Sequence, residues 1–99
     1  MAVAYFHEYP EATPELAHQV ADQINQQVGS TPPQGALYHA EGSLEGGGWW
    51  AFDVWEAEEA AERFYTETLT PVLQKLNGPE PRPRKLAVQW ETSQPPPSS

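Results

Sequence analysis

The chain contains no cysteine. Disulfide bonds, thiolate metal sites and cysteine nucleophiles are therefore excluded, and nothing favours an oxidising compartment. The N-terminus has no basic segment of the kind that begins a secretory signal peptide, and the acidic Glu8 arrives too early for one. No apolar run approaches the roughly 20 residues that a membrane-spanning helix needs. We therefore expect a cytoplasmic protein.

Basic residues are scarce. The chain has five Lys and Arg residues against 14 Asp and Glu residues, which gives a net charge of −9 at pH 7, and no basic residue precedes Arg63. An acidic surface without a basic patch repels phosphate backbones, so we expect no nucleic-acid partner. The lack of a long apolar run leads us to expect no membrane partner. A high net charge also favours solubility, which is the simpler reason for this composition.

A chain of 99 residues has the length of one domain. Hydrophobic periodicity and turn residues predict the order β-α-β-β-α-β, which is typical of a ferredoxin-like α+β fold with a four-stranded antiparallel sheet. We expect residues 1–92 to form this domain and the Pro- and Ser-rich tail, 93–99, to be disordered. The predicted strands are Val3–Tyr9, Ala36–Glu41, Trp49–Trp55 and Lys85–Glu91, and the predicted helices span residues 14–28 and 56–76.

Proline and glycine mark the expected ends of these elements. Thr13 and Pro14 supply a capping hydroxyl and a proline at the first helical position, and Gly29 ends that helix. Pro71 lies inside the second apolar helical stripe and predicts a break or a kink there. Thr70 and Pro71 also suit the cap and the first position of a helix, so we expect a second helical piece to restart at that point. The glycines at 46–48 precede a strand, so they predict a hairpin turn and not a phosphate-binding loop.

The third predicted strand is apolar on both faces, which indicates that both faces are covered. The chain has only enough helix to cover one face, so we expect a second copy of the sheet to cover the other and form a homodimer. We assign the dimer to the face that carries Trp49, Ala51, Asp53 and Trp55, and the opposite face carries Trp50, Phe52 and Val54.

The run from Trp50 to Leu73, WAFDVWEAEEAAERFYTETLTPVL, resembles the dimeric α+β barrel superfamily, and within it small proteins similar to antibiotic-biosynthesis monooxygenases. The resemblance rests on a strand that ends in Val54-Trp55-Glu56 and runs into an acidic helix with an aromatic residue at Phe64. The His39-Ala40 segment ahead of a glycine turn is also similar. In order of elements, the likeness extends over residues 3–91.

This resemblance implies a ligand cavity between the sheet and its own helices, with the opposite sheet face closing a dimer. It also implies catalysis that often needs no flavin or metal, so we expect no cofactor. One branch of the superfamily degrades haem with an axial histidine late in the second helix. Gln74 occupies that region and residues 56–77 contain no histidine, so haem chemistry is a poor fit.

The three histidines do not predict a metal site. The strand order 4-1-3-2 of this fold separates His7 from His39 by the third strand, a distance of roughly 10 Å. Ligands of one metal ion lie near 2 Å from it, so the two residues cannot share one. His18 lies off the apolar stripe of its helix and is expected to be exposed.

Three residues are candidates for catalysis: His39, Glu8 and Asp53. His39 is the preferred general base, since its unperturbed pKa of about 6.5 lies near neutrality. Asp53 either orients His39 or is a structural carboxylate bonded to a nearby Trp, Tyr or Arg at the dimer interface. Glu8 shares a strand face with Phe6 and serves as the alternate base if that face meets the helices. Otherwise it is a carboxylate in solvent.

Aromatic residues are dense for so small a core, and aromatic walls suit a flat polycyclic or phenolic ligand. Most of these residues must also serve as ordinary core or interface. The expected ligand-binding residues are Phe6, Tyr38, Trp50, Phe52 and Phe64. The favoured function is a cofactor-independent monooxygenase, cyclase or isomerase that acts on an aromatic or polyketide-like compound. The rival is a non-catalytic dimeric protein that binds a small ligand or accompanies a pathway, because fold does not determine function.

Overall fold

A computed structural model describes residues 2–29 and 32–89. The predicted tail lies outside these ranges, as do Trp90 and Glu91 of the predicted fourth strand. The elements lie close to their predicted positions, except that the fourth strand starts one residue early, at Arg84, and already ends at Ala87, so that Val88 and Gln89 lie outside it. Their bounds are β1 (Val3–Tyr9), α1 (Pro14–Val28), β2 (Ala36–Ser43), β3 (Trp49–Trp55), α2 (Glu58–Phe64), the π-helical turn η1 (Tyr65–Leu69), α3 (Thr70–Lys75) and β4 (Arg84–Ala87).

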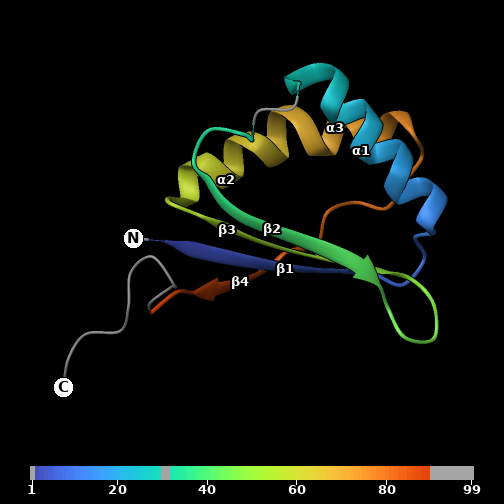
Figure 1. Ribbon diagram of the computed structural model, residues 1–99, viewed down its shortest axis with the longest axis horizontal. Helices are drawn as coiled ribbons and strands as arrows, with labels where there is room; N and C mark the ends of the chain where they lie inside the picture. Colours follow the sequence, from blue (N-terminus) through green and yellow to red (C-terminus); the bar gives the residue numbers. More distant parts are fainter. Residues whose placement is uncertain (1, 30–31, 90–99) are drawn as a thin grey trace.

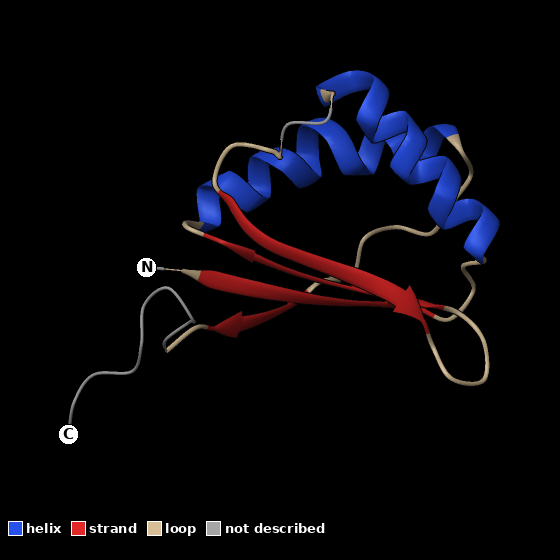
Figure 2. Cartoon of the chain, viewed as in Figure 1, coloured by secondary structure: helices blue, strands red, loops and turns tan. Residues whose placement is uncertain are grey.

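The four strands form one antiparallel sheet in the order β2-β3-β1-β4, which confirms the predicted α+β fold and strand order (Figure 1). The helices all lie on one face of this sheet (Figure 2). In the described part of the chain, no helix packs on the opposite face, which we call the open face. Across residues 2–29 and 32–89, none of the helices combines the length and the hydrophobicity that crossing a membrane would take.

Helix α1 begins and ends as the sequence predicts. The Thr13 side chain accepts a hydrogen bond from the backbone N–H of Leu16 at 3.1 Å, which satisfies one of the free donors of the first turn. Gly29 ends the helix with a φ of 72°, a conformation that glycine adopts without strain.

The helical stretch from α2 to α3 does not break at Pro71. The chain stays helical through η1, whose wider turn brings the backbone N–H of Thr70 to the carbonyl of Tyr65, five residues earlier. Pro71 then occupies the start of α3, where a missing N–H is tolerated. The second helical piece that the sequence predicts from Thr70-Pro71 is confirmed as α3, and the widened turn before it replaces a complete break in the helix.

The predicted assignment of the two faces of β3 is also wrong. Trp49, Ala51, Asp53 and Trp55 lie on the helical side, where the Trp55 and Phe64 ring centroids are 5.4 Å apart. Trp50 packs over Gly42 on the open face, and Phe52 packs against Tyr38 there, with ring centroids 6.3 Å apart. Alternation along the strand separates the two sets but does not say which one meets the helices.

The buried core lies where β1 and β3 meet α2. Its central residues are Val3, Tyr5, Trp55 and Ala61, of which Ala61 is completely inaccessible. Because β1 and β3 are adjacent and antiparallel, their helical-side residues form one continuous surface under the helices. That surface carries the candidate site.

Candidate active site

A cavity of about 390 Å³ lies between the helical layer and the sheet. This volume falls in the range that is usual for small-molecule sites. Apolar side chains of α1 and of the α2–α3 stretch line its helical side, among them Leu16, Val20, Ile24, Phe64 and Leu73. The sheet supplies most of the polar groups, which are His7, Tyr9, His39, Glu41 and Asp53. The arrangement suits a largely apolar ligand with a reactive polar group facing the sheet.

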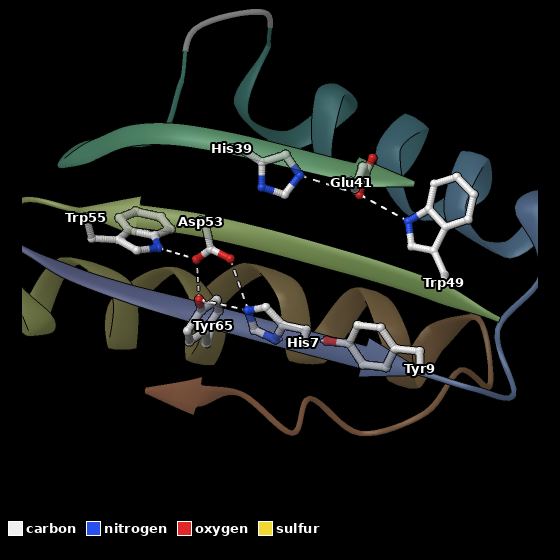
Figure 3. Close-up of polar contacts among 8 residues, drawn as sticks. All are labelled: His7, Tyr9, His39, Glu41, Trp49, Asp53, Trp55 and Tyr65. Atoms are coloured by element: carbon white, nitrogen blue, oxygen red, sulfur yellow. Dashed lines mark hydrogen bonds and ion pairs between the residues drawn. The ribbon is translucent and has the colours of Figure 1, made fainter. Parts of the chain in front are cut away.

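Five side chains form a connected set of hydrogen bonds between the sheet and η1, which we call the buried network: His7, Tyr9, Asp53, Trp55 and Tyr65 (Figure 3). His7 Nε2 lies 3.0 Å from Asp53 Oδ1 and 3.1 Å from the Tyr65 hydroxyl. The Trp55 indole N–H and the Tyr65 hydroxyl both donate to Asp53 Oδ2. One carboxylate therefore accepts from three side chains.

Asp53 is held in its ionised form. Burial by itself raises the pKa of Asp53, but the hydrogen bonds from His7, Tyr65 and Trp55 outweigh burial and place it below its ordinary value. Burial and the bond to this carboxylate raise the pKa of Tyr65, so its hydroxyl keeps its proton. An ionised carboxylate only accepts, so His7 Nε2 carries a hydrogen and donates to it.

Tyr9 completes the buried network on the other side of the imidazole. Its hydroxyl lies 3.2 Å from His7 Nδ1, and the two rings are nearly parallel with centroids 6.0 Å apart. In the neutral imidazole Nδ1 has no hydrogen, so the Tyr9 hydroxyl donates to it. Burial, followed by the charge of Asp53, raises the pKa of Tyr9 to about 12.

Two local features of the backbone assemble the buried network. Tyr5, His7 and Tyr9 alternate along β1 and all reach the helical side, and Asp53 and Trp55 do the same on β3. Tyr65 opens the π-helical turn, which sets the position of the hydroxyl over Asp53. Turns of this type are frequent at functional sites.

A second imidazole–carboxylate pair lies at the exposed edge of the cavity, and we call it the rim pair: His39 and Glu41 of β2. His39 Nε2 lies 3.4 Å from Glu41 Oε2, which also accepts from the Trp49 indole at 3.4 Å (Figure 3). The hydrogen bond to Glu41 raises the pKa of His39, and the same bond lowers the pKa of Glu41. The His39 side chain is 55% exposed.

The predicted site residues fall into two groups. The cavity brings together His39, Asp53 and Phe64. Tyr38 also contributes to the lining, but its ring packs against Phe52 on the open face. Phe6 and Glu8 line a separate shallow hollow with Pro10, Arg82 and Arg84, and Trp50 and Phe52 lie on the open face. The face with Phe6 and Glu8 does not meet the helices, because Tyr5, His7 and Tyr9 take that side of β1. Phe6 is therefore not part of the cavity, and the exposed Glu8 agrees with the alternative of a carboxylate in solvent.

Asp53 has a different partner from the predicted one. Its Cα is paired with that of His39 across β2 and β3, yet its oxygens bind His7, Tyr65 and Trp55, while His39 binds Glu41. The alternative of a carboxylate bonded to neighbouring Trp and Tyr side chains describes these contacts better, although they lie at the cavity and not on the open face. Within the described ranges, no group of three or more His, Asp or Glu side chains is arranged to hold a metal ion.

Sequence reasoning missed His7, Tyr9 and Tyr65 as site residues. The alternation Tyr5-x-His7-x-Tyr9 was a usable signal, since three polar aromatic residues on one strand face are unusual for a plain core. Tyr65 gave no comparable signal, because an α-helix and a π-helical turn place that residue differently and the pattern does not distinguish them.

Comparison with known proteins yields structural matches only. No protein-family model matches the chain, and no curated protein does. A variant of SnoaB, a cofactor-independent oxygenase from Streptomyces nogalater, has a TM-score of 0.63 at 11% identity, covering 94% of this chain and 97% of that one. A candidate antibiotic biosynthesis monooxygenase from Chloroflexus aurantiacus has a TM-score of 0.60 at 12% identity, covering 89% and 93%.

A third structure, a candidate antibiotic biosynthesis monooxygenase from Deinococcus radiodurans, has a TM-score of 0.56 at 14% identity, covering 89% of this chain and 92% of its own. Coverage of nearly the whole length of all three proteins leaves no large insertion in either chain. At these identities the likeness establishes the fold. The resemblance inferred from the sequence is confirmed at that level: the chain has the fold of the antibiotic biosynthesis monooxygenase-like proteins.

Proposed function

We propose that this chain is a cofactor-independent enzyme of the monooxygenase, cyclase or isomerase type, acting on an aromatic or polyketide-like compound. The observation that carries the proposal is one cavity that joins apolar helical walls to two imidazole–carboxylate pairs on the sheet. In this reaction a base removes a proton from a phenol or an α-carbon, and the resulting anion reacts with oxygen or closes a ring. The shared fold with a cofactor-independent oxygenase supports this choice of class.

The base is the His7–Asp53 pair. Its carboxylate is ionised and buried, so it stabilises an imidazolium on His7 more strongly than an exposed carboxylate would. The rim pair lies where the ligand enters, and His39, half exposed, contacts the polar end of the ligand. This assignment moves the base from His39, the residue that the sequence favours, to the buried histidine.

Matched substitutions test the assignment after a thermal-shift screen of phenolic and polyketide-like aromatic compounds has supplied a substrate. His7→Gln should keep the ligand bound while turnover falls roughly 10²–10⁴-fold, the contribution typical of a general base. His39→Gln should raise KM more than it lowers kcat. The reverse pattern would return the role of the base to His39.

A non-catalytic ligand-binding protein is the second candidate. It is favoured by the completeness of the hydrogen bonding, since in the described part of the chain every buried side-chain nitrogen and oxygen has a partner. A network of this kind can simply stabilise a core. Tight binding of a screened compound, with no chemical change in the presence of oxygen, would favour this candidate.

We also propose a homodimer in which a second copy of the chain covers the open face. Tyr38 and Leu86, which are 58% and 42% exposed, lie on this face with Phe6, Trp50 and Phe52. Large apolar side chains exposed together on one sheet face favour association, although Glu8 and Arg84 lie beside them. The interface is thus the opposite side of β3 from the one that the sequence pattern suggested.

A further inference from the structure

The imidazole of His7 has no free nitrogen with which to meet a ligand. The residue is 2% exposed, Nε2 is engaged by Asp53 and Tyr65, and Nδ1 is engaged by the Tyr9 hydroxyl. A base must lie within hydrogen-bond reach of the proton that it removes, directly or through one intervening group. If His7 is the proton acceptor, some other group must deliver the proton to it.

The two hydroxyls that contact His7 differ in what they can do. Tyr65 donates its hydrogen to Asp53, and its oxygen lies against the donor nitrogen Nε2. Tyr9 lies against Nδ1, the nitrogen that has a lone pair to accept a proton, and it also lines the cavity. Tyr9 is therefore the hydroxyl that connects the cavity to the acceptor nitrogen.

We propose that Tyr9 is a catalytic residue that takes the proton from the substrate and passes its own proton to His7. The proposal rests on the proposed function and names its proton path. A substrate C–H or O–H bond breaks as a bond forms to Tyr9 Oη, while the Tyr9 O–H bond breaks as an N–H bond forms at His7 Nδ1. The products are a substrate anion, neutral Tyr9 and an imidazolium paired with Asp53, so protons and charge balance.

The electrostatics of the buried network agree with this role. A pKa of about 12 keeps Tyr9 protonated near neutral pH, so it relays a proton and does not store the negative charge. The imidazolium that forms lies 3.0 Å from an ionised carboxylate. The other ionisable side chains of the sheet that line the cavity all belong to β2: Tyr38, His39 and Glu41. His39 and Glu41 lie at its exposed edge.

The lining also narrows the class of substrate. Among the described residues, the cavity is lined by two carboxylates and no Lys or Arg. A carboxylate or phosphate ligand would therefore meet like charge, because the imidazole of His39, the lining histidine whose pKa is raised, is already paired with Glu41. The site accordingly takes a neutral aromatic compound whose proton is weakly acidic, which becomes an anion only after it is bound.

Exchange of a carbon-bound proton with deuterated solvent tests the relay without requiring oxygen chemistry. The probe is 2-tetralone, a neutral bicyclic aromatic ketone with an acidic benzylic C–H, at a concentration that saturates its thermal shift. The exchange is monitored under nitrogen as the loss of the NMR signal of the benzylic protons that are next to the carbonyl group. We expect the wild-type protein to accelerate exchange, and Tyr9→Phe to slow it at least 10²-fold.

Tyr5→Phe is the matched control, because it removes the same hydroxyl from the same strand face, outside the cavity and the buried network, and should exchange at the wild-type rate. If Tyr9→Phe does not fold, Tyr9→Gln keeps an N–H donor for His7 Nδ1 and should show the same loss. Exchange at the wild-type rate in these variants, with exchange abolished in His7→Gln, would overturn the relay and leave the proposed function standing. No acceleration by the wild-type protein would overturn both.

Discussion

His7 Nε2 on β1 lies 3.0 Å from Asp53 Oδ1 on β3, and both side chains are almost completely buried. The bond crosses two adjacent strands, and Tyr65 ties the same carboxylate to the helical layer. A single ionised carboxylate thus connects the sheet to the helical layer. Removing this carboxylate should affect the stability of the fold as well as any chemistry.

Asp53→Asn should destabilise the fold by about 2–4 kcal/mol at pH 7, because in either orientation the amide nitrogen would face a donor, either His7 Nε2 or the pair of Tyr65 and Trp55. Folding lowers the pKa of Asp53, so its ionisation stabilises the protein above the unfolded pKa of about 3.9. This stabilisation is lost as pH falls through the lower folded pKa. Urea unfolding at pH 7 and pH 3 should show the gap between wild type and variant narrowing. Parallel pH profiles would contradict the prediction.

The rim pair should be visible in the titration of His39. Its hydrogen bond to Glu41 raises the pKa of His39, so the imidazolium should persist above the unperturbed value of about 6.5. The associated stabilisation is present below that value and is lost as pH rises through the folded pKa. Glu41→Gln should lower the midpoint, as measured by NMR of the imidazole protons. An unchanged midpoint would show that the two side chains do not interact in solution.

Aspartate substitutions on the two faces of β3 should separate dimerisation from the cavity. Phe52→Asp places a charge on the open face and should dissociate the dimer at micromolar concentration in sedimentation experiments. Ala51→Asp is the neighbouring control on the cavity side, and its folded fraction should remain dimeric. A monomeric wild-type protein would contradict the proposed homodimer, and dissociation by Ala51→Asp alone would restore the interface that the sequence suggested.

Two glycines of the hairpin before β3, Gly47 and Gly48, should differ in how well they tolerate alanine. Gly47 and Gly48 both have positive φ, at 114° and 102°, so a side chain is strained at either position. A Cβ on Gly48 would also lie 2.8 Å from Pro10 Cα and 2.9 Å from the Tyr9 carbonyl oxygen, whereas a Cβ on Gly47 meets nothing within 4 Å. Gly48→Ala should therefore lose about 1–3 kcal/mol more than Gly47→Ala in urea unfolding. Equal losses of unfolding free energy would mean that the backbone at the end of β1 moves to make room for the added Cβ.

Local patterns predicted the elements and their order. The alternation in Val3–Tyr9 and Trp49–Trp55, the cap at Thr13 and the turn at Gly46-Gly47-Gly48 each depend on residues that are close in sequence, and the structure confirms all of them. The strand order followed from the βαββαβ succession. These features are determined by backbone propensities and by side-chain periodicity, which a sequence displays directly.

The site depends on tertiary contacts between residues that are far apart in the sequence. Both faces of β3 are apolar, so only packing against α2 decided that Trp55 lies under the helices and Trp50 on the open face. The partner of Asp53 was decided in the same way, because its donors come from β1 and from a π-helical turn that the helical periodicity does not reveal. The sequence by itself determined which side chains are able to carry acid–base chemistry. The tertiary structure decided which of them meet, because hydrogen bonds between distant segments form only after strand register and helix packing are established.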